Sequence, residues 1–334
     1  MAEMRAILKQ GTSVRVRRVP VPEPDAGEVL IRVAVAGVCR SDVNAALGLV
    51  PCADPLVLGH EFSGVIAGLA PDVRGFAVED RVTVMPVIPC LKCERCAEGD
   101  TECCPYHERI GFRRPGAFAE FVTVPAQVVH RMPGALTFRE GAYAEPVCSS
   151  LGVLKAEIKP PDRGLVHGAD RTARLTERVL RSYGFTSLDV RGTGTGEDRA
   201  ERIPSDTYDF VVASEPRAEV LDEMIRVARP GGRVIVRGRP LEPVAIDLDA
   251  ALRKEVTLES VSYGAFAESL AFLSQENEPV SDLLGSVRPL EDFEDVFSAE
   301  SESQRLKSFF CPNFAAIGTE EIEAWARLMC PGAR

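Results

Sequence analysis

The first half of the chain alternates apolar and polar residues over short runs, as β-strands do when one face is buried. The clearest runs are residues 29–35, 62–67, 79–84 and 116–124. Prolines and glycines separate the runs, with Pro20, Pro22 and Pro24 close together. Residues 1 to about 150 are therefore expected to form a β-rich domain that carries loops. A short helix is expected at residues 41–47, with Ser41 as its N-cap.

From about residue 160 the pattern changes to short apolar strands that alternate with amphipathic helices. Strands are expected at residues 164–168, 186–191, 208–213 and 233–238, and helices at residues 171–183 and 218–228. Gly184 and Pro230 follow the two helices, where such residues commonly end a helix. This alternation predicts βαβ units and a parallel sheet. A final amphipathic helix is expected at residues 319–329, capped by Thr319.

The composition excludes some classes of partner. The formal net charge is -11 and the pI is about 5.1, so the chain offers no overall positive field to a nucleic acid or an anionic membrane. It has no run of about 18 apolar residues that could span a bilayer. Its N-terminus leads directly into a strand-like run without the apolar region of a signal peptide, so a cytoplasmic location is expected.

Ten cysteines in such a chain indicate metal rather than disulfides. Four of them are closely spaced: Cys90, Cys93, Cys96 and Cys104. Four thiolates in one short polar loop can close a tetrahedral structural zinc site. Cys103 is an alternative to Cys104 as the fourth ligand, and disulfides are an alternative to the metal. Small buried or partly buried apolar residues are expected at Cys52, Cys148, Cys311 and Cys330.

A second metal site is indicated by Cys39 and His60. Each follows a strand-like run close to a glycine, and His60 is one of only four histidines. A catalytic zinc takes three protein ligands and leaves one position open, so a carboxylate or a second cysteine would complete this pair. Taken alone, His60 could equally be a loop histidine with ordinary hydrogen bonds.

Several motifs occur in the order found in one enzyme family. They are Cys39-x-Ser41-Asp42, Gly59-His60-Glu61-Phe62-Ser63-Gly64, the cysteine run, Gly116-Ala117-Phe118-Ala119-Glu120-Phe121 and Glu145-Pro146. As a set they resemble the zinc-containing medium-chain alcohol dehydrogenases, over residues 1 to about 312. Glu145-Pro146 is similar to the branch of polyol, sorbitol and threonine dehydrogenases, in which this glutamate replaces a cysteine ligand.

The resemblance implies a role for each matching residue. The catalytic zinc ligands that it implies are Cys39, His60 and Glu145. Cys148 is the alternative third ligand. Asp42 would orient His60, Glu61 would lie behind the metal, and Ser41 would pass the hydroxyl proton of the substrate towards solvent. Zinc would lower the pKa of the bound alcohol, and the alkoxide would give a hydride to NAD or NADP.

The resemblance also implies an α/β architecture of two domains. A GroES-like, partly open β-barrel of residues 1–152, completed by residues 298–334, would bind zinc. A Rossmann-like domain with a doubly wound parallel sheet, residues 153–297, would bind the nucleotide and be partly truncated. Relatives are commonly homodimers or homotetramers, so one of these assemblies is expected, with a small-molecule substrate. Residues 313–334 have no readable role.

The nucleotide-binding fingerprint is degenerate. A dinucleotide turn needs G-x-G-x-x-G so that the backbone can approach the pyrophosphate, whereas this chain has Gly168-Ala169-Asp170-Arg171-Thr172-Ala173. Gly168 and Ala173 suit the first and third positions, but Asp170 puts a side chain and a negative charge at the second. An N-cap is its expected structural role.

The adenosine side of the nucleotide site also departs from the family. Arg191 stands where an acidic residue would bind the ribose, and an arginine there would suit the 2′-phosphate of NADP. Residues 192–207 leave too little chain for the additional helix and strand that the family has in this interval.

The favoured function is a zinc-dependent oxidoreductase that interconverts a secondary alcohol and a ketone by hydride transfer with NAD(P). A polyol, cyclitol, sugar or amino-alcohol is the expected substrate. The altered fingerprint leaves one main alternative, a zinc enzyme on the same scaffold that catalyses elimination, cyclisation or hydration. A relative without activity is a weaker explanation, because it would not need an open zinc site.

Overall fold

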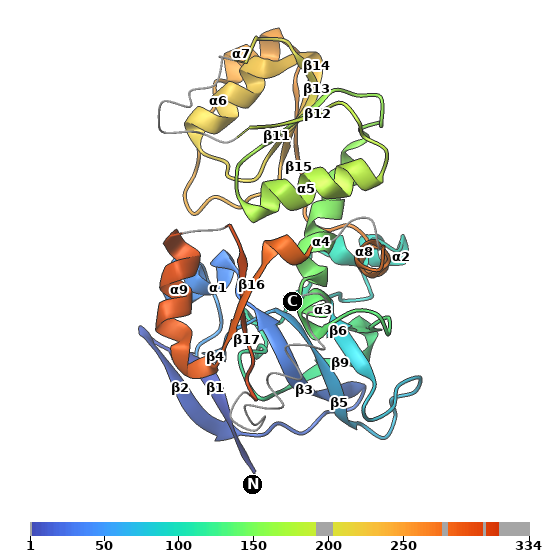
Figure 1. Ribbon diagram of the computed structural model, residues 1–334, viewed down its shortest axis with the longest axis vertical. Coiled ribbons are helices and arrows are strands. Elements are labelled where there is room, and N and C mark those ends of the chain that lie inside the picture. Colours follow the sequence, from blue (N-terminus) through green and yellow to red (C-terminus); the bar gives the residue numbers. More distant parts are fainter. Residues whose placement is uncertain (1, 192–202, 276–279, 303–304, 314–334) are drawn as a thin grey trace. The chain divides into compact units, whose positions relative to one another are not determined.

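The computed structural model describes residues 2–191, 203–275, 280–302 and 305–313 (Figure 1). The helix expected at residues 319–329, Cys330 and most of the interval 192–207 lie outside these ranges. Tertiary contacts divide the chain into two compact units, Met1–Glu145 with Ser269–Arg334 and Pro146–Glu268. No helix in the described ranges is both long enough and apolar enough to cross a lipid bilayer.

The first unit consists mainly of antiparallel strands. Its strands are β1 (Glu3–Gln10), β2 (Ser13–Pro20), β3 (Glu28–Gly37), β4 (Leu56–Val57), β5 (Glu61–Leu69), β6 (Arg81–Val84), β7 (Val87–Ile88), β8 (Glu108–Arg109), β9 (Phe121–Pro125), β10 (Val129–Arg131), β16 (Leu284–Arg288) and β17 (Lys307–Phe310). The largest sheet has the order β10-β6-β5-β3-β17-β16, with β9 also paired to β3. A second sheet has the order β2-β1-β4, and β7 pairs with β8. The GroES-like barrel is confirmed.

Strand β3 organises the first unit because it pairs with β5, β9 and β17. Its last residues, 33–37, are buried except where their neighbours cover them completely from both faces, and Val33 and Val35 are 0% exposed. The antiparallel pairing aligns Gly37, the last residue of β3, with Glu61, the first residue of β5. The loops that follow β3 and precede β5 are therefore neighbours in space, although they are separate in the sequence.

The helices of the first unit are short. They are α1 (Arg40–Ala46), α2 (Glu94–Ala97), α3 (Phe138–Ala142) and α9 (Phe293–Glu302), with 3-10 turns η1 (Thr101–Cys103), η2 (Ala126–Val128), η4 (Ser281–Leu283) and η5 (Leu290–Asp292). The prediction of Ser41 as the N-cap of α1 was wrong. Cys39 is the N-cap, and its N–H donates to Asp42 Oδ2 at 3.0 Å. The cysteine run is not a plain loop either, because α2 and η1 lie within it.

The second unit contains a five-stranded sheet in which every pairing is parallel. Its strands are β11 (Gly164–His167), β12 (Leu188–Arg191), β13 (Tyr208–Ala213), β14 (Ala228–Val236) and β15 (Thr257–Ser260), in the order β12-β11-β13-β14-β15. Its helices are α5 (Arg171–Ser182), α6 (Ala218–Val227) and α7 (Leu248–Arg253), with the 3-10 turn η3 (Gly152–Ala156). The prediction that the fourth strand starts at residue 233 was wrong, because its pairing with β13 already begins at Ala228.

Alternate residues of β13 face two separate cores. Phe210 and Val212 belong to the core that includes α5, whereas Val211 and Ala213 belong to the core that includes α6. Figure 1 shows these two helices on opposite faces of the sheet. Burial on both faces explains the continuous apolar run in β13, and the doubly wound Rossmann-like fold is confirmed.

The direction of winding reverses between β11 and β13, because β12 lies on one side of β11 and β13 on the other. In open parallel sheets, ligands bind outside the carboxyl ends of the strands at such a point. His167 ends β11 and Ala213 ends β13, so the segments after these two residues form the expected nucleotide edge.

The units divide the chain at 145/146 and 268/269, whereas the sequence suggested domain boundaries at 152/153 and 297/298. The first division falls inside α4 (Ala144–Leu151) and the second inside α8 (Phe266–Leu273). Residues 284–288 join the sheet of the first unit because β16 pairs with β17, which in turn pairs with β3.

Candidate metal and nucleotide sites

The loop before β5 carries His60 and is held by backbone contacts. Gly59 has φ +98°, in the left-handed region that favours glycine. The N–H groups of residues 116–118 donate to the carbonyls of residues 57–59 at 2.8–2.9 Å, and a Cβ on Gly116 would lie 2.1 Å from Gly59 O. The strand expected at residues 116–124 therefore begins only at Phe121, because residues 116–118 bind this loop instead.

His60 is fully buried, and only one of its ring nitrogens has a protein partner. Its Nδ1 lies 2.8 Å from Asp42 Oδ1. Its Nε2 has no hydrogen-bond partner among the described residues. Burying a polar atom without a partner costs free energy. If Nδ1 carries the proton and donates it to Asp42, Nε2 keeps a lone pair that is available to a metal.

The electrostatic surroundings of His60 are negative. Burial lowers the pKa of the imidazole, but the Asp42 carboxylate outweighs burial and the pKa lies well above its usual range. The Arg109 guanidinium opposes this rise. The net direction shows that negative charge dominates around the ring, as a cation-binding site requires.

Cys39 and the first turn of α1 complete one side of the site. The ligand atoms of Cys39, His60 and Glu61 all lie within 4.8 Å of one another. Ser41 Oγ donates to Cys39 Sγ at 3.2 Å, and Asp42 contacts both the Cys39 N–H and the His60 ring. The structure thus brings together the residues that the two glycine-flanked motifs singled out.

Two carboxylates flank the Nε2 atom of His60. Glu145 Oε1 lies 3.7 Å from it and Glu61 Oε1 lies 4.0 Å from it. Nitrogen and oxygen ligands of a tetrahedral zinc lie about 3.3 Å apart, so Glu145 needs the smaller shift. Burial raises the pKa of Glu61, and the neighbouring Lys307 opposes that rise without cancelling it.

Each of these carboxylates has a cation beside it that the sequence did not reveal. Lys307 Nζ contacts Glu61 Oε2, and Arg109 Nη2 lies 3.9 Å from Glu145 Oε1. The Arg109 guanidinium also stacks over Phe112 at 4.5 Å. Neither cation belongs to a recognisable spacing pattern. The signal is the pairing of distant strands, which a single sequence does not state.

This donor set fits zinc. Thiolate, imidazole nitrogen and carboxylate oxygen are its usual protein ligands, and Cys39, His60 and Glu145 supply one of each. Cys148 is placed differently, because its thiol donates to Gly264 O at 3.2 Å.

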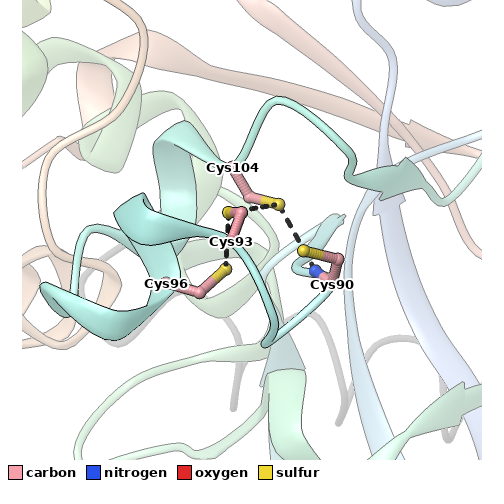
Figure 2. A group of neighbouring side chains, drawn as sticks. All are labelled: Cys90, Cys93, Cys96 and Cys104. Atoms are coloured by element: carbon pink, nitrogen blue, oxygen red, sulfur yellow. Dashed lines mark hydrogen bonds between the residues drawn. The ribbon is translucent and has the colours of Figure 1, made fainter.

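The four closely spaced cysteines converge on one point (Figure 2). Cys93 Sγ lies 3.5 Å from Cys96 Sγ and 3.8 Å from Cys104 Sγ. Thiolates around a tetrahedral zinc lie about 3.8 Å apart when each Zn–S bond is about 2.3 Å. A hydrogen bond from the Lys92 N–H lowers the pKa of Cys90 to about 6, which favours the thiolate that a metal needs. Cys103 is not part of the group.

The turn between β11 and α5 keeps the shape of a dinucleotide site but not its charge. Gly168 has φ +137°, and a Cβ there would lie 3.0 Å from Ala173 Cβ. The prediction that Asp170 is an N-cap is confirmed, since its Oδ1 accepts from the Ala173 N–H at 2.8 Å. The carboxylate therefore occupies a donor that would otherwise face a pyrophosphate.

Two more residues lie at the carboxyl edge of this sheet. Arg191 is the last residue of β12 and pairs with His167. Ser214 follows β13, and its Oγ is buried without a hydrogen-bond partner among the described residues. The sequence analysis missed Ser214, which only the position after a buried strand could have indicated. Its hydroxyl is available to a ligand at this edge.

Comparison with known proteins decides the family. Residues 25–134 match the alcohol dehydrogenase GroES-like domain. D-xylulose reductase A of Aspergillus oryzae is 28% identical over 328 residues, which cover 86% of this chain and 91% of that protein. Sorbitol dehydrogenase of Halalkalibacterium halodurans is 32% identical over 217 residues, which cover 64% of this chain and 63% of that protein. The chain belongs to the zinc-containing medium-chain alcohol dehydrogenase family. This confirms the resemblance found in the sequence.

The fold of this medium-chain dehydrogenase is shared with solved structures. A short chain alcohol dehydrogenase of Escherichia coli, solved with NADH, aligns with a TM-score of 0.82 and 25% identity. The alignment covers 92% of this chain and 99% of that one. Both halves of the chain therefore have counterparts in an enzyme that binds a reduced nicotinamide cofactor.

Proposed function

We propose that this chain is a zinc-dependent oxidoreductase that interconverts a secondary alcohol and a ketone with NAD or NADP. The observation that carries the proposal is the buried Nε2 of His60, which has no hydrogen-bond partner among the described residues and is flanked by two carboxylates. Cys39, His60 and Glu145 would hold the zinc. Membership of the dehydrogenase family favours this function over elimination, cyclisation or hydration on the same scaffold.

The residues around the site have separate tasks in this proposal. When bound, zinc supplies a Lewis acid that lowers the pKa of the substrate hydroxyl. Asp42 holds Nδ1 of His60 and thereby turns Nε2 towards the metal. Ser41 is half-buried and bonded to Cys39 Sγ, so its hydroxyl can accept the substrate proton and pass it towards solvent.

The substrate class follows from the relatives and from Glu145. The relatives described above are named for sorbitol and xylulose, and the glutamate in place of a cysteine ligand belongs to the same branch. We therefore place polyols and their ketoses first among candidate substrates, followed by cyclitols, other sugars and amino-alcohols.

The nucleotide is NAD or NADP. Gly168, Ala173 and the buried Ser214 hydroxyl suit a dinucleotide at the carboxyl edge of the sheet, whereas Asp170 opposes the charge of its pyrophosphate. Arg191 at the end of β12 favours NADP, because a guanidinium can bind a 2′-phosphate.

Turnover assays test this function. Zinc-loaded protein is incubated with sorbitol, xylitol, 2,3-butanediol or L-threonine and either NAD+ or NADP+, and the absorbance of the reduced nicotinamide is followed. Turnover of at least one pair is expected, with loss in Cys39→Ser and retention in Cys52→Ser. Protein that carries two zinc ions but binds neither NADH nor NADPH would contradict the redox function.

The assembly and location are part of the proposal. We expect a homodimer or homotetramer, to be measured by light scattering on the eluting protein. The nine described cysteines outside any disulfide favour a reducing compartment, and thus the cytoplasm.

A further inference from the structure

Lys307 and Glu61 form an ion pair that is almost completely removed from solvent. Their side chains are 2% and 1% exposed. Lysine is rarely buried to this extent unless it is paired, and a buried pair is strongly destabilised when one partner is removed. The pair lies beside the proposed metal site, because the other oxygen of Glu61 is 4.0 Å from His60 Nε2.

The strand register explains how the pair forms. Strand β3 lies between β17 and β5, and Gly37 of β3 is aligned with Phe309 on one side and Glu61 on the other. Lys307 is two residues from Phe309 and so points to the same face. A Cβ on Gly37 would lie 2.8 Å from Glu61 Oε2 and 3.0 Å from Lys307 Cε. The absence of a side chain at Gly37 leaves the space in which the pair lies.

The two carboxylates near His60 create a conflict for a catalytic metal. Cys39, His60, Glu61 and Glu145 together would supply four ligands. A four-coordinate zinc with four protein ligands is closed to substrate. An open site therefore needs one carboxylate to be held back.

The two carboxylates differ in how firmly they are held. Moving Glu61 to the metal would leave the Lys307 ammonium buried without its counter-charge. Glu145 has a looser partner, because Arg109 lies 3.9 Å away and its side chain is 24% exposed. Arg109 can keep part of its hydration when Glu145 binds a metal, whereas Lys307 cannot.

We propose that Lys307 is a positioning residue that holds Glu61 outside the coordination shell and so keeps the fourth metal position open for the substrate. The inference rests on the metal site of the proposed function and adds the residue that keeps that site open. Lys307 touches neither substrate nor metal, and it acts through Glu61.

The test uses cobalt and a small anion rather than turnover. Full-length native protein is compared with Lys307→Met, Lys307→Arg and the double variant Lys307→Met with Glu61→Gln. Each is loaded with Co²⁺ and titrated with azide while the visible absorption is recorded. The four-cysteine site has no open position, so a spectral response to azide reports the His60 site alone.

Azide is expected to bind the cobalt of native protein and of Lys307→Arg. In Lys307→Met, Glu61 is expected to take the open position and weaken azide binding about 10-fold or more, and the double variant should restore it. Unchanged azide affinity in Lys307→Met, with two cobalt ions bound, would overturn the inference and leave the proposed function intact. Native protein that binds only one cobalt ion would overturn both.

Folding of Lys307→Met also decides the matter. A variant that is unfolded without metal and refolds with cobalt supports the inference, since the metal then replaces the lysine as the partner of Glu61. A variant that folds only when Glu61→Gln is added, whether or not cobalt is present, contradicts it.

Discussion

At the scale of single residues, the site depends on how Asp42 holds His60. One carboxylate oxygen contacts the ring and the other accepts the Cys39 N–H, so Asp42 orients two proposed ligands at once. This side chain is 0% exposed, and it also keeps the pKa of His60 high. Glu145 and Glu61 have no comparable contact with a second ligand.

Asp42→Asn is expected to weaken zinc binding at the His60 site by about 10- to 100-fold, because the ring loses its charged partner. Competition with a colorimetric chelator measures this affinity. Asp249→Asn is the matched control, since Asp249 lies on α7 with its side chain 71% exposed. Equal zinc affinity in both variants would contradict the role of Asp42.

Asp170→Gly is expected to tighten the binding of NADPH or NADH by about fivefold or more, because the Ala173 N–H becomes free to meet a phosphate. The same change should lower the free energy of unfolding by a few tenths of a kcal/mol to about 1 kcal/mol, since it removes an N-cap and adds a glycine. Fluorescence titration and urea unfolding measure the two effects. Weaker nucleotide binding in Asp170→Gly would show that the carboxylate contributes to the site.

Residue identities were readable from the sequence where the chemistry is local. Cys39, His60 and Asp42 stand in short motifs next to glycines, and Asp170 stands at a helix start. Lys307 was not readable, because it meets Glu61 only through the pairing of β17, β3 and β5. The wrong N-cap at Ser41 has a similar cause, since Asp42 bonds backward to Cys39.

At the scale of elements, the loop of residues 57–59 and the segment of residues 116–118 act together. Their backbones are hydrogen-bonded at three points, and Gly116 has no side chain because the Gly59 carbonyl occupies that space. This contact fixes the approach of His60 to the site.

Gly116→Ala is expected to lower the free energy of unfolding by about 1–3 kcal/mol or more and to weaken zinc binding, because a methyl group would displace the loop before His60. Gly134→Ala is the control, since a Cβ at Gly134 has no atom within 4 Å and its effect should stay within about 0.5 kcal/mol. Denaturant unfolding distinguishes them. Equal stability of the two variants would refute the contact as a constraint.

The cysteine segment is an element that metal must stabilise. Its helix α2 has four residues, far fewer than an isolated helix needs. Cys93→Ser is expected to remove one zinc ion per chain and to expose this segment to limited proteolysis, whereas Cys52→Ser should do neither. A cleavage pattern in Cys93→Ser identical to that of native protein would exclude a structural zinc there.

At the scale of the whole molecule, hydrophobic periodicity was sufficient to predict one β-rich half and one half of alternating strands and helices. The family motifs then named the architectures. Sequence could not place β16 in the first sheet, because its parallel pairing with β17 depends on tertiary contacts. It also gave no signal for Arg109, which meets Glu145 only in the folded chain.

The central claim is that this chain carries a zinc ion on Cys39 and His60 as well as one on the four cysteines. Zinc content per chain, measured by mass spectrometry of native protein and of Cys39→Ser, tests it most directly. Two ions in native protein and one in folded Cys39→Ser are predicted. One ion in native protein, or two in Cys39→Ser, would contradict the account.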